Sequence, residues 1–295
     1  MAVYVNTNVS SLNGRRYLNN VQNSLTTTYQ RLSSGMRINS AKDDSAGLQI
    51  ADRLTSQING LNQGNRNAND GIALAQTIES GMDEISSMLQ KIRTLAVQSS
   101  NGTNTTEDRV ALDKEAESLR EEITRIAKQT KFGGQTVLAG KVAGSIYGAG
   151  DTASGQLVLQ VGANNGDKIS FDVSNFTFSS IIALASVAAS AAEADDIKLS
   201  AASNAMEVIA AMDDMIAVVD AQRADLGAIQ NRLESSIRNQ SNVAANQSDA
   251  RSRIRDADFA EESANLSQQS VIQQAATSML MQANTRPQLA LSMLG

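Results

Sequence analysis

The chain has 295 residues, a formal net charge of −6 at pH 7, and neither cysteine nor histidine. The missing cysteines exclude disulfides and thiolate chemistry, the missing histidines remove the commonest general base and zinc ligand, and the acidic balance argues against a nucleic-acid surface. A single proline and only 3% aromatic residues favour long, uninterrupted helices whose contacts are aliphatic.

The first predicted element is a helical arm near the N-terminus. Residues 1–8 have neither a basic nor an apolar segment, so we expect no cleaved signal peptide and, if the chain leaves the cell, export by another route. The apolar seam of the arm consists of Leu18, Val21, Leu25, Thr28 and Leu32. The longest apolar stretch of the chain, residues 181–192, is too short to cross a bilayer, so we expect no contact with a membrane.

Two long helices are predicted next. Residues 57–100 carry apolar side chains at alternating spacings of three and four, with one short step after Ala75, which is the pattern of a coiled-coil seam. Residues 101–104 include Gly102 and predict a turn, and Thr105 or Thr106 is suited to cap a second helix over residues 104–131. The seam of that helix consists of Leu112, Ala116, Leu119, Ile123 and Ile126.

The middle of the chain is rich in glycine, and the helical pattern stops there. Apolar residues alternate on both sides of a glycine-containing turn at residues 162–166, which predicts a β-hairpin over residues 157–173. Residues 176–200 are rich in alanine and serine, and their pattern is too weak to assign.

The second half of the chain returns to helix over residues 200–247. Its seam keeps unbroken spacings of three and four from Ala205 to Leu233, and such a seam needs partner helices. The expected fold is therefore mainly α, a long antiparallel helical bundle or coiled coil formed by the N- and C-terminal halves, with a small central β-hairpin region. Arg251, Arg253 and Arg255 alternate with other residues, and we interpret them as an extended connector with its charges in solvent.

A second arm lies near the C-terminus, with a seam of Ile272, Ala276, Met279 and Ala283. Both arms are short and narrow, and a pair of such helices buries little surface. We therefore expect the arms to become ordered when many copies of the chain assemble and cover one another's seams.

Both ends of the chain resemble bacterial flagellins. The matching stretches are NTNVSSLN at residues 6–13, QRLSSGMRINSAKDDSAGL at 30–48, ARSRIRDADFA at 250–260 and QANTRPQLALSMLG at 282–295. The resemblance covers roughly residues 1–140 and 200–295. Because these stretches are long and contiguous at both termini, the resemblance is specific.

The resemblance implies two domains. Residues 1–46 and 251–295 are expected to form an inner core domain of terminal helices, with connecting spokes around 34–46 and 251–259. Residues 47–250 are expected to form an outer core domain, whose hairpin corresponds to the element that the family uses in switching between filament states. The middle of the chain is too short for a large outer insertion.

The resemblance further implies a secreted, extracellular structural subunit of the flagellar filament that serves swimming, with no catalytic activity, cofactor or metal. Its implied partners are other copies of the chain, an export chaperone that holds the C-terminal arm, the type III export apparatus, the filament cap and hook-junction proteins, and an innate immune receptor of animals. Inner-tube assembly is assigned to Leu18, Val21, Leu25, Leu32 and Met279. The outer-core interface and the receptor contact are assigned to Lys91, Leu95 and Glu115, although the family pattern has an arginine at the position of Lys91, and lysine does not reproduce a planar bidentate contact.

Three alternatives are weaker. A filament-junction protein related to flagellin would be nearly absent from sheared filaments, and the full-length match of the C-terminal arm argues against it. A peptidase of the kind that a few flagellins carry needs a histidine pair, which the sequence lacks. A membrane translocator needs an apolar hairpin long enough to insert, and the sequence has none.

Overall fold

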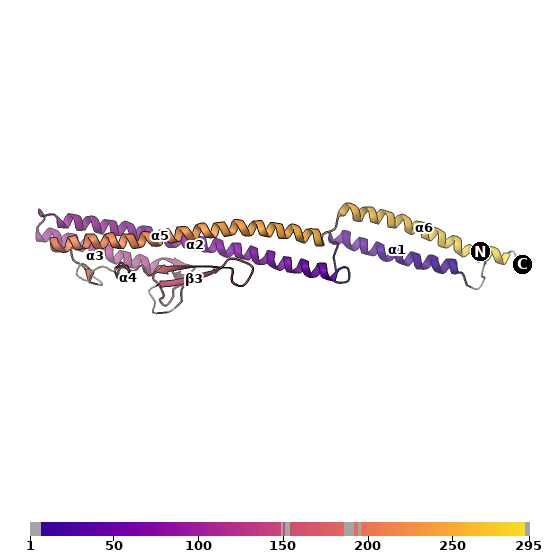
Figure 1. Ribbon diagram of the computed structural model, residues 1–295, viewed down its shortest axis with the longest axis horizontal. Coiled ribbons are helices and arrows are strands. Elements are labelled where there is room, and N and C mark those ends of the chain that lie inside the picture. Colours follow the sequence, from indigo (N-terminus) through magenta and orange to yellow (C-terminus); the bar gives the residue numbers. More distant parts are fainter. Residues whose placement is uncertain (1–6, 149, 151–153, 186–191, 194–195, 293–295) are drawn as a thin grey trace. The chain divides into compact units, whose positions relative to one another are not determined.

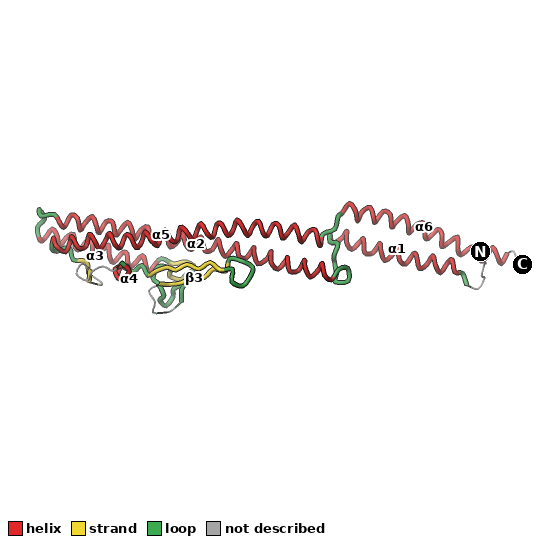
Figure 2. Tube along the Cα trace, in the orientation of Figure 1, coloured by secondary structure: helices red, strands yellow, loops and turns green. Residues whose placement is uncertain are grey.

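The computed structural model describes residues 7–148, 150, 154–185, 192–193 and 196–292, which are mainly helical (Figure 1; Figure 2). In chain order the elements are α1 (Val9–Ser34), α2 (Ser45–Ser100), α3 (Thr106–Gln129), β1 (Lys131–Phe132), β2 (Gln135–Thr136), β3 (Ser154–Gln160), β4 (Lys168–Ser174), α4 (Phe178–Leu184), β5 (Ala192–Glu193), β6 (Asp196–Ile197), α5 (Ala202–Arg255) and α6 (Phe259–Ser292). Two compact units result, the first formed by Met1–Ile58 with Ala244–Gly295 and the second by Asn59–Val243.

The second unit is built on the seams of α2 and α5. The apolar seam positions of α5 are fully or nearly buried, and only the polar seam position, Gln222, is half-buried. On α2 the run from Ile78 to Ala96 is buried without exception at its seam positions, and Ile72 is half-buried. These aliphatic contacts supply the core, as the spacing of the sequence predicts.

Polar contacts show that α2 and α5 run antiparallel. Near one end of the unit, Asn65 Nδ2 donates to Ser241 Oγ at 3.3 Å. Near the other end, Arg93 Nε lies 2.6 Å from Asp213 Oδ1. The residue number falls along α5 as it rises along α2, so the antiparallel bundle predicted from the two halves of the chain is confirmed.

The helix α3 turns back along α2 after a tight connection. The Thr105 side chain accepts from the Asp108 N–H at 3.2 Å, and the Asp108 carboxylate accepts from the Thr105 N–H at 3.0 Å, which closes a capping box at the start of α3. The bond from the Thr105 N–H lowers the pKa of Asp108 below its usual value. The cap is thus Thr105, one of the two residues that the sequence predicted.

The predicted hairpin is present and pairs β3 with β4 in antiparallel register. On β4, Ile169, Phe171 and Val173 face the core and are buried, while the residues between them are exposed, which is the alternation of a half-buried strand. The hairpin is also held to α2, because Asn67 Nδ2 donates to the carbonyl of Gln160 at 2.8 Å.

The hairpin lies against a row of glycines on α2. A Cβ atom added to Gly64 would meet the carbonyl oxygen of Val161 at 2.1 Å, and one added to Gly71 would meet Leu159 Cδ1 at 2.3 Å. At Gly60 an added Cβ would lie 2.8 Å from the Cβ of Ala163. Because glycine has no side chain, the hairpin can pack directly against the backbone of α2.

The stretch over residues 176–200 contains the short helix α4. Phe178, Ile181 and Ile182 of α4 are buried, as is the preceding Phe176, so this segment belongs to the core of the second unit. Residues 186–191 and 194–195 of the stretch lie outside the described residues.

The helix α2 begins at Ser45, so the predicted start at residue 57 is wrong. Asp44 Oδ1 accepts from the N–H groups of Ala46 and Gly47, at 3.1 and 2.9 Å, and thereby satisfies free donors of the first turn. The spacing of three and four in fact runs back from Ile58 through Leu54 and Ala51, so the sequence already carried a signal for the earlier start.

The interpretation of Arg251, Arg253 and Arg255 as an extended connector is also wrong, because α5 continues to Arg255. Arg253 Nη2 pairs with Asp249 Oδ2 at 2.9 Å across one helical turn, and Arg251 Nη1 reaches Thr55 Oγ1 at 3.5 Å. Basic side chains in the last turn of a helix also suit its partial negative charge.

Candidate assembly surface

The terminal helices α1 and α6 pair within the first unit. Val21 and Leu25 of α1 and Ala276 of α6 are buried in this pair. At one end Asn8 Nδ2 donates to the carbonyl of Ala283 at 2.8 Å, and at the other end Arg31 Nη1 lies 2.9 Å from Glu262 Oε1. These two polar contacts fix the register of a pair that has few buried apolar side chains.

The connection after α1 folds back against the end of α5. The N–H of Arg37 donates to the carbonyl of Arg255 at 2.7 Å, and Arg37 Nη2 donates to the carbonyl of Ile254 at 2.8 Å. The helix α1 itself ends at Ser34 and is followed by the cap Gly35, whose φ of 70° is left-handed and suits glycine. Backbone and side-chain groups of Arg37 thus both hold the connection against the end of α5.

Asp43 organises the same connection. Its Oδ2 accepts from the N–H and the hydroxyl of Ser40, at 2.9 and 3.0 Å, and from the N–H of Asn39 at 3.2 Å. The bonds from Ser40 are the main reason that the pKa of Asp43 lies below its usual value. The turn is therefore held by the ionised form of the carboxyl group.

Large apolar side chains of α1 and α6 remain exposed to solvent. They are Val9, Leu12, Tyr17 and Tyr29 on α1 and Phe259, Val271, Met279 and Met281 on α6. Single exposed apolar residues are ordinary on a soluble protein, but their repetition along two narrow helices is typical of an interaction surface. We call these eight residues the outer apolar set.

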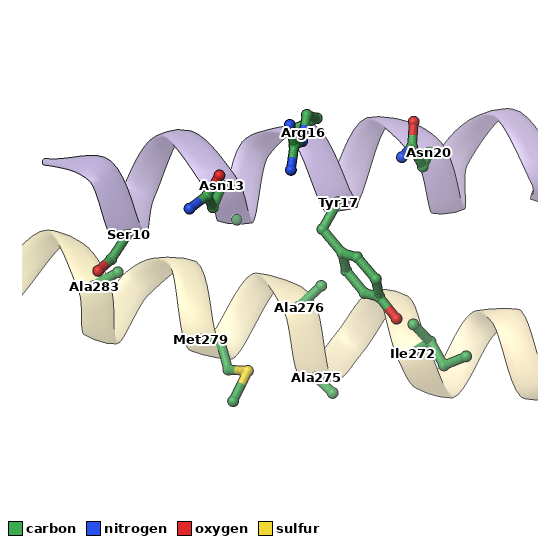
Figure 3. A pocket seen from close by; sticks show the side chains of 11 residues that line it. Ser10, Asn13, Arg16, Tyr17, Asn20, Ile272, Ala275, Ala276, Met279 and Ala283 are labelled. Atoms are coloured by element: carbon green, nitrogen blue, oxygen red, sulfur yellow. The ribbon is translucent and has the colours of Figure 1, made fainter.

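A groove of about 690 Å³ lies between the two helices (Figure 3). Tyr17 of α1 extends across it toward α6, where Ile272, Ala275 and Ala276 line its floor. Asn13 and Asn20 of α1 add polar groups to its rim. Its apolar floor is suited to a helix or an aromatic side chain.

The residues predicted for inner-tube assembly do not all lie on the outside of this pair. Val21 and Leu25 are buried in the contact between α1 and α6, and Leu18 and Leu32 are half-buried. Met279 is 72% exposed and lines the groove. The other members of the outer apolar set were not singled out from sequence, because they fall outside the seam positions on which the prediction relied.

Lys91, Leu95 and Glu115 lie in the second unit, on α2 and α3. Lys91 Nζ is 3.3 Å from Glu115 Oε1, and both side chains are about half exposed. Leu95 is only 7% exposed and belongs to the core of the unit. The structure therefore brings the two charged residues together on the surface and places the leucine beneath it.

Among the described residues, no group of three acidic side chains is placed to hold a metal ion. No described helix combines the length and the apolar character that a bilayer span requires.

The comparisons with known proteins agree with this architecture. Residues 5–143 match the family model of the bacterial flagellin N-terminal helical region, and residues 209–294 match that of the C-terminal helical region. Flagellin D of Vibrio anguillarum and Flagellin A of Vibrio cholerae are each 36% identical to this chain, and each alignment covers all of both proteins. A solved structure of a putative flagellar hook-associated protein from Vibrio parahaemolyticus, 18% identical, has the same fold with a TM-score of 0.56, covering 72% of this chain and all of that one.

The alignments with the curated relatives run over 377 and 378 positions, more than the 295 residues of this chain, so those relatives have residues without a counterpart here. The two family matches include α1 to α3 on one side and most of α5 with α6 on the other, which are the helices that build both units. This chain belongs to the bacterial flagellin family and is a structural subunit of the flagellar filament.

Proposed function

We propose that the chain is exported from the cell and polymerises into an extracellular filament that serves swimming, with the pair of α1 and α6 forming the inner tube. The observation that carries this proposal is the outer apolar set, which leaves large side chains uncovered along both helices. Covering a half-exposed side chain of this size contributes about 1 kcal/mol. The loss of translational and rotational freedom on association costs several kcal/mol, so assembly needs the set as a whole and not a single residue.

The division into an inner core domain of residues 1–46 and 251–295 and an outer core domain of residues 47–250 is part of the proposal. Support comes from the two compact units, whose boundaries lie at Ile58 and Ala244. Each unit has its own buried residues, with the large apolar core in the second. Polymerisation in this view depends on the first unit, while the second folds on contacts of its own.

A truncation and a matched set of point variants test the inner-tube assignment. Removal of residues 261–295 should abolish growth from filament seeds and leave the helix content of the second unit intact by circular dichroism. The triple variant Leu12→Gln, Val271→Gln and Met279→Gln should also fail to grow, whereas Met206→Gln, at an exposed position of α5 in the second unit, should grow normally. Filaments from the truncated chain would refute the assignment.

We also infer that the chain is not an enzyme. Three carboxyl groups with a lowered pKa, Asp43, Asp108 and Glu122, accept hydrogen bonds from a turn, a helix cap and Arg125 respectively, and each is exposed. Such groups stabilise local structure and do not form the converging acid and base pair that catalysis requires.

The remaining partners are proposed from family membership. They are the chaperone that binds the C-terminal arm, the cap protein and the hook-junction proteins. A role as a junction protein is the alternative, since the similarity to a hook-associated protein concerns the fold alone. Quantification of this chain in sheared native filaments distinguishes the two roles, because a subunit of the shaft dominates such material and a junction protein is nearly absent from it.

We further propose that the monomer is recognised by the animal innate immune receptor through Lys91, Leu95 and Glu115. The exposed ion pair of Lys91 and Glu115 offers a charged contact, with Leu95 supporting it from below. In a receptor reporter assay, Lys91→Arg should raise the response because arginine makes bidentate contacts, and Lys91→Glu should abolish it. A monomer that gives no response in either the natural or the Lys91→Arg form would exclude recognition at this site.

A further inference from the structure

Two methionines occupy the flanks of α6 at the point where the helix contacts α1. Between them Leu280 faces α1, since its Cδ1 atom would lie 3.1 Å from a Cβ atom added to Gly14. Successive residues of a helix point about 100° apart, so the side chains on either side of Leu280 turn away from α1. Met279 and Met281 are 72% and 65% exposed, and Figure 3 shows the thioether of Met279 pointing away from α1.

Exposure decides which methionines an oxidant reaches. Met82, Met212 and Met215 are fully buried in the core of the second unit, whereas Met279 and Met281 meet solvent on a narrow helix pair. A thioether sulfur attacks one oxygen of hydrogen peroxide, a sulfur–oxygen bond forms while the oxygen–oxygen bond breaks, and water leaves. The sulfur is oxidised by two electrons and the peroxide is reduced by two.

From this placement we propose that Met279 and Met281 are modification sites through which peroxide blocks polymerisation reversibly. The inference rests on the proposed function, in which neighbouring copies cover α6. A methionine side chain adapts to an apolar contact, but a sulfoxide is polar and brings a strong acceptor into it. Burial of that acceptor without a donor weakens the contact, by about tenfold in affinity per sulfoxide.

The oxidation is confined to the step before assembly. In a filament the two thioethers would be covered by neighbouring copies and shielded from peroxide. A free subunit is therefore sensitive and an assembled one is resistant. Methionine sulfoxide reductases return the sulfoxide to the thioether with two electrons from a dithiol, which becomes a disulfide while the oxygen leaves as water, so the block is removable.

The test uses the full chain and dilute hydrogen peroxide. Monomers are oxidised until peptide mass spectrometry finds sulfoxide at Met279 and Met281, and growth on unoxidised seeds is followed by light scattering. We expect growth to slow at least about tenfold and to return after treatment with methionine sulfoxide reductase. Intact filaments given the same peroxide should acquire sulfoxide at these two residues much more slowly than monomers do.

Two leucine variants separate this effect from general oxidative damage. The double variant Met279→Leu and Met281→Leu conserves volume, keeps every other methionine, and should grow at the same rate before and after peroxide. Met206→Leu removes a methionine of similar exposure from the second unit and should remain as sensitive as the natural chain.

Equal growth of oxidised and unoxidised natural chain, with sulfoxide present at both sites, would overturn the proposal and leave the proposed function standing. Equal inhibition of the double leucine variant would overturn it in the same way. Failure of the unoxidised chain to grow from seeds would instead contradict the proposed function, and the inference with it.

Discussion

The glycine row on α2 makes the substitution Gly64→Ala a sharp test of how the hairpin is docked. The added Cβ atom would lie 2.1 Å from the carbonyl oxygen and 2.7 Å from the carbonyl carbon of Val161. Both atoms belong to the backbone, so a rotamer change cannot relieve the contact and the hairpin must move away from α2. Movement weakens the burial of Val161, which is 5% exposed, and the bond from Asn67 to Gln160.

The expected magnitude follows from three contributions. Overpacking of this kind costs about 1–3 kcal/mol, and weakening of one hydrogen bond costs about 0.5–1.5 kcal/mol. Alanine in place of glycine in a helix interior contributes about 1 kcal/mol in the opposite direction. The net loss is about 2 kcal/mol, which lowers the melting temperature of a domain of this size by about 4–8 °C.

Thermal unfolding of the monomer followed by circular dichroism measures this loss, and matched glycines on the same chain give the controls. Gly227 of α5 has no atom within 4 Å of an added Cβ, so Gly227→Ala should raise the melting temperature by about 2–4 °C. Gly71→Ala should fall between the two, because its added Cβ meets the movable end of Leu159. A Gly64→Ala variant that melts at or above the natural temperature, with unchanged amide protection in the hairpin, would refute close docking on the glycine row.

Three further perturbations address local contacts. Ser99→Ala removes a fully buried hydroxyl that donates to the carbonyl of Leu199 at 2.7 Å. We expect the free energy of unfolding, measured by urea titration, to fall by about 1–3 kcal/mol. An unchanged midpoint would contradict that bond. Thr105→Ala opens the capping box with Asp108 and should lower stability by about 1 kcal/mol, visible as faster amide exchange confined to the first turn of α3. The pKa of Asp43 is lowered from its ordinary value of 3.8, so its contribution to the stability of the turn is complete above 3.8 and is lost as the pH falls through the lower pKa of the folded state. Amide exchange of residues 36–43 should therefore become faster only in strong acid. The variant Asp43→Asn should show that faster exchange already at neutral pH.

The sequence was most informative where apolar spacing alone determines the structure. The seams around Ile85 and Met215 predicted α2 and α5, and the alternation at Phe171 predicted the hairpin, because each pattern reflects one buried face. The start of α2 was missed although its signal was present. Asp44 caps the helix, and Ala51 and Leu54 continue the apolar spacing back from Ile58, but the prediction began the seam only at Ile58.

Contacts between distant residues were beyond reach of the sequence. The bond between Arg31 and Glu262 and the one between Ser99 and Leu199 join positions whose proximity only the folded chain reveals. Glycine in a helix interior ordinarily weakens the helix, and nothing near Gly64 in the sequence indicates that the hairpin will cover it. The outer apolar set was missed for a related reason: residues outside a seam are expected to be polar, and the exceptions become visible only when exposure is known.

The antiparallel contacts between α2 and α5 also limit the order in which the chain can fold. Asn65 finds Ser241 across 176 residues, and Gln57 finds Gln247 across 190 residues, so the long helices pair only after nearly the whole chain has emerged from the ribosome. Contacts of such separation form slowly, because a long loop must close before any of them contributes stability. A fragment of residues 1–200 should accordingly show little amide protection along α2. A chain that is exported from one end would have no stable bundle to unfold until its last third, which contains α5, has been synthesised.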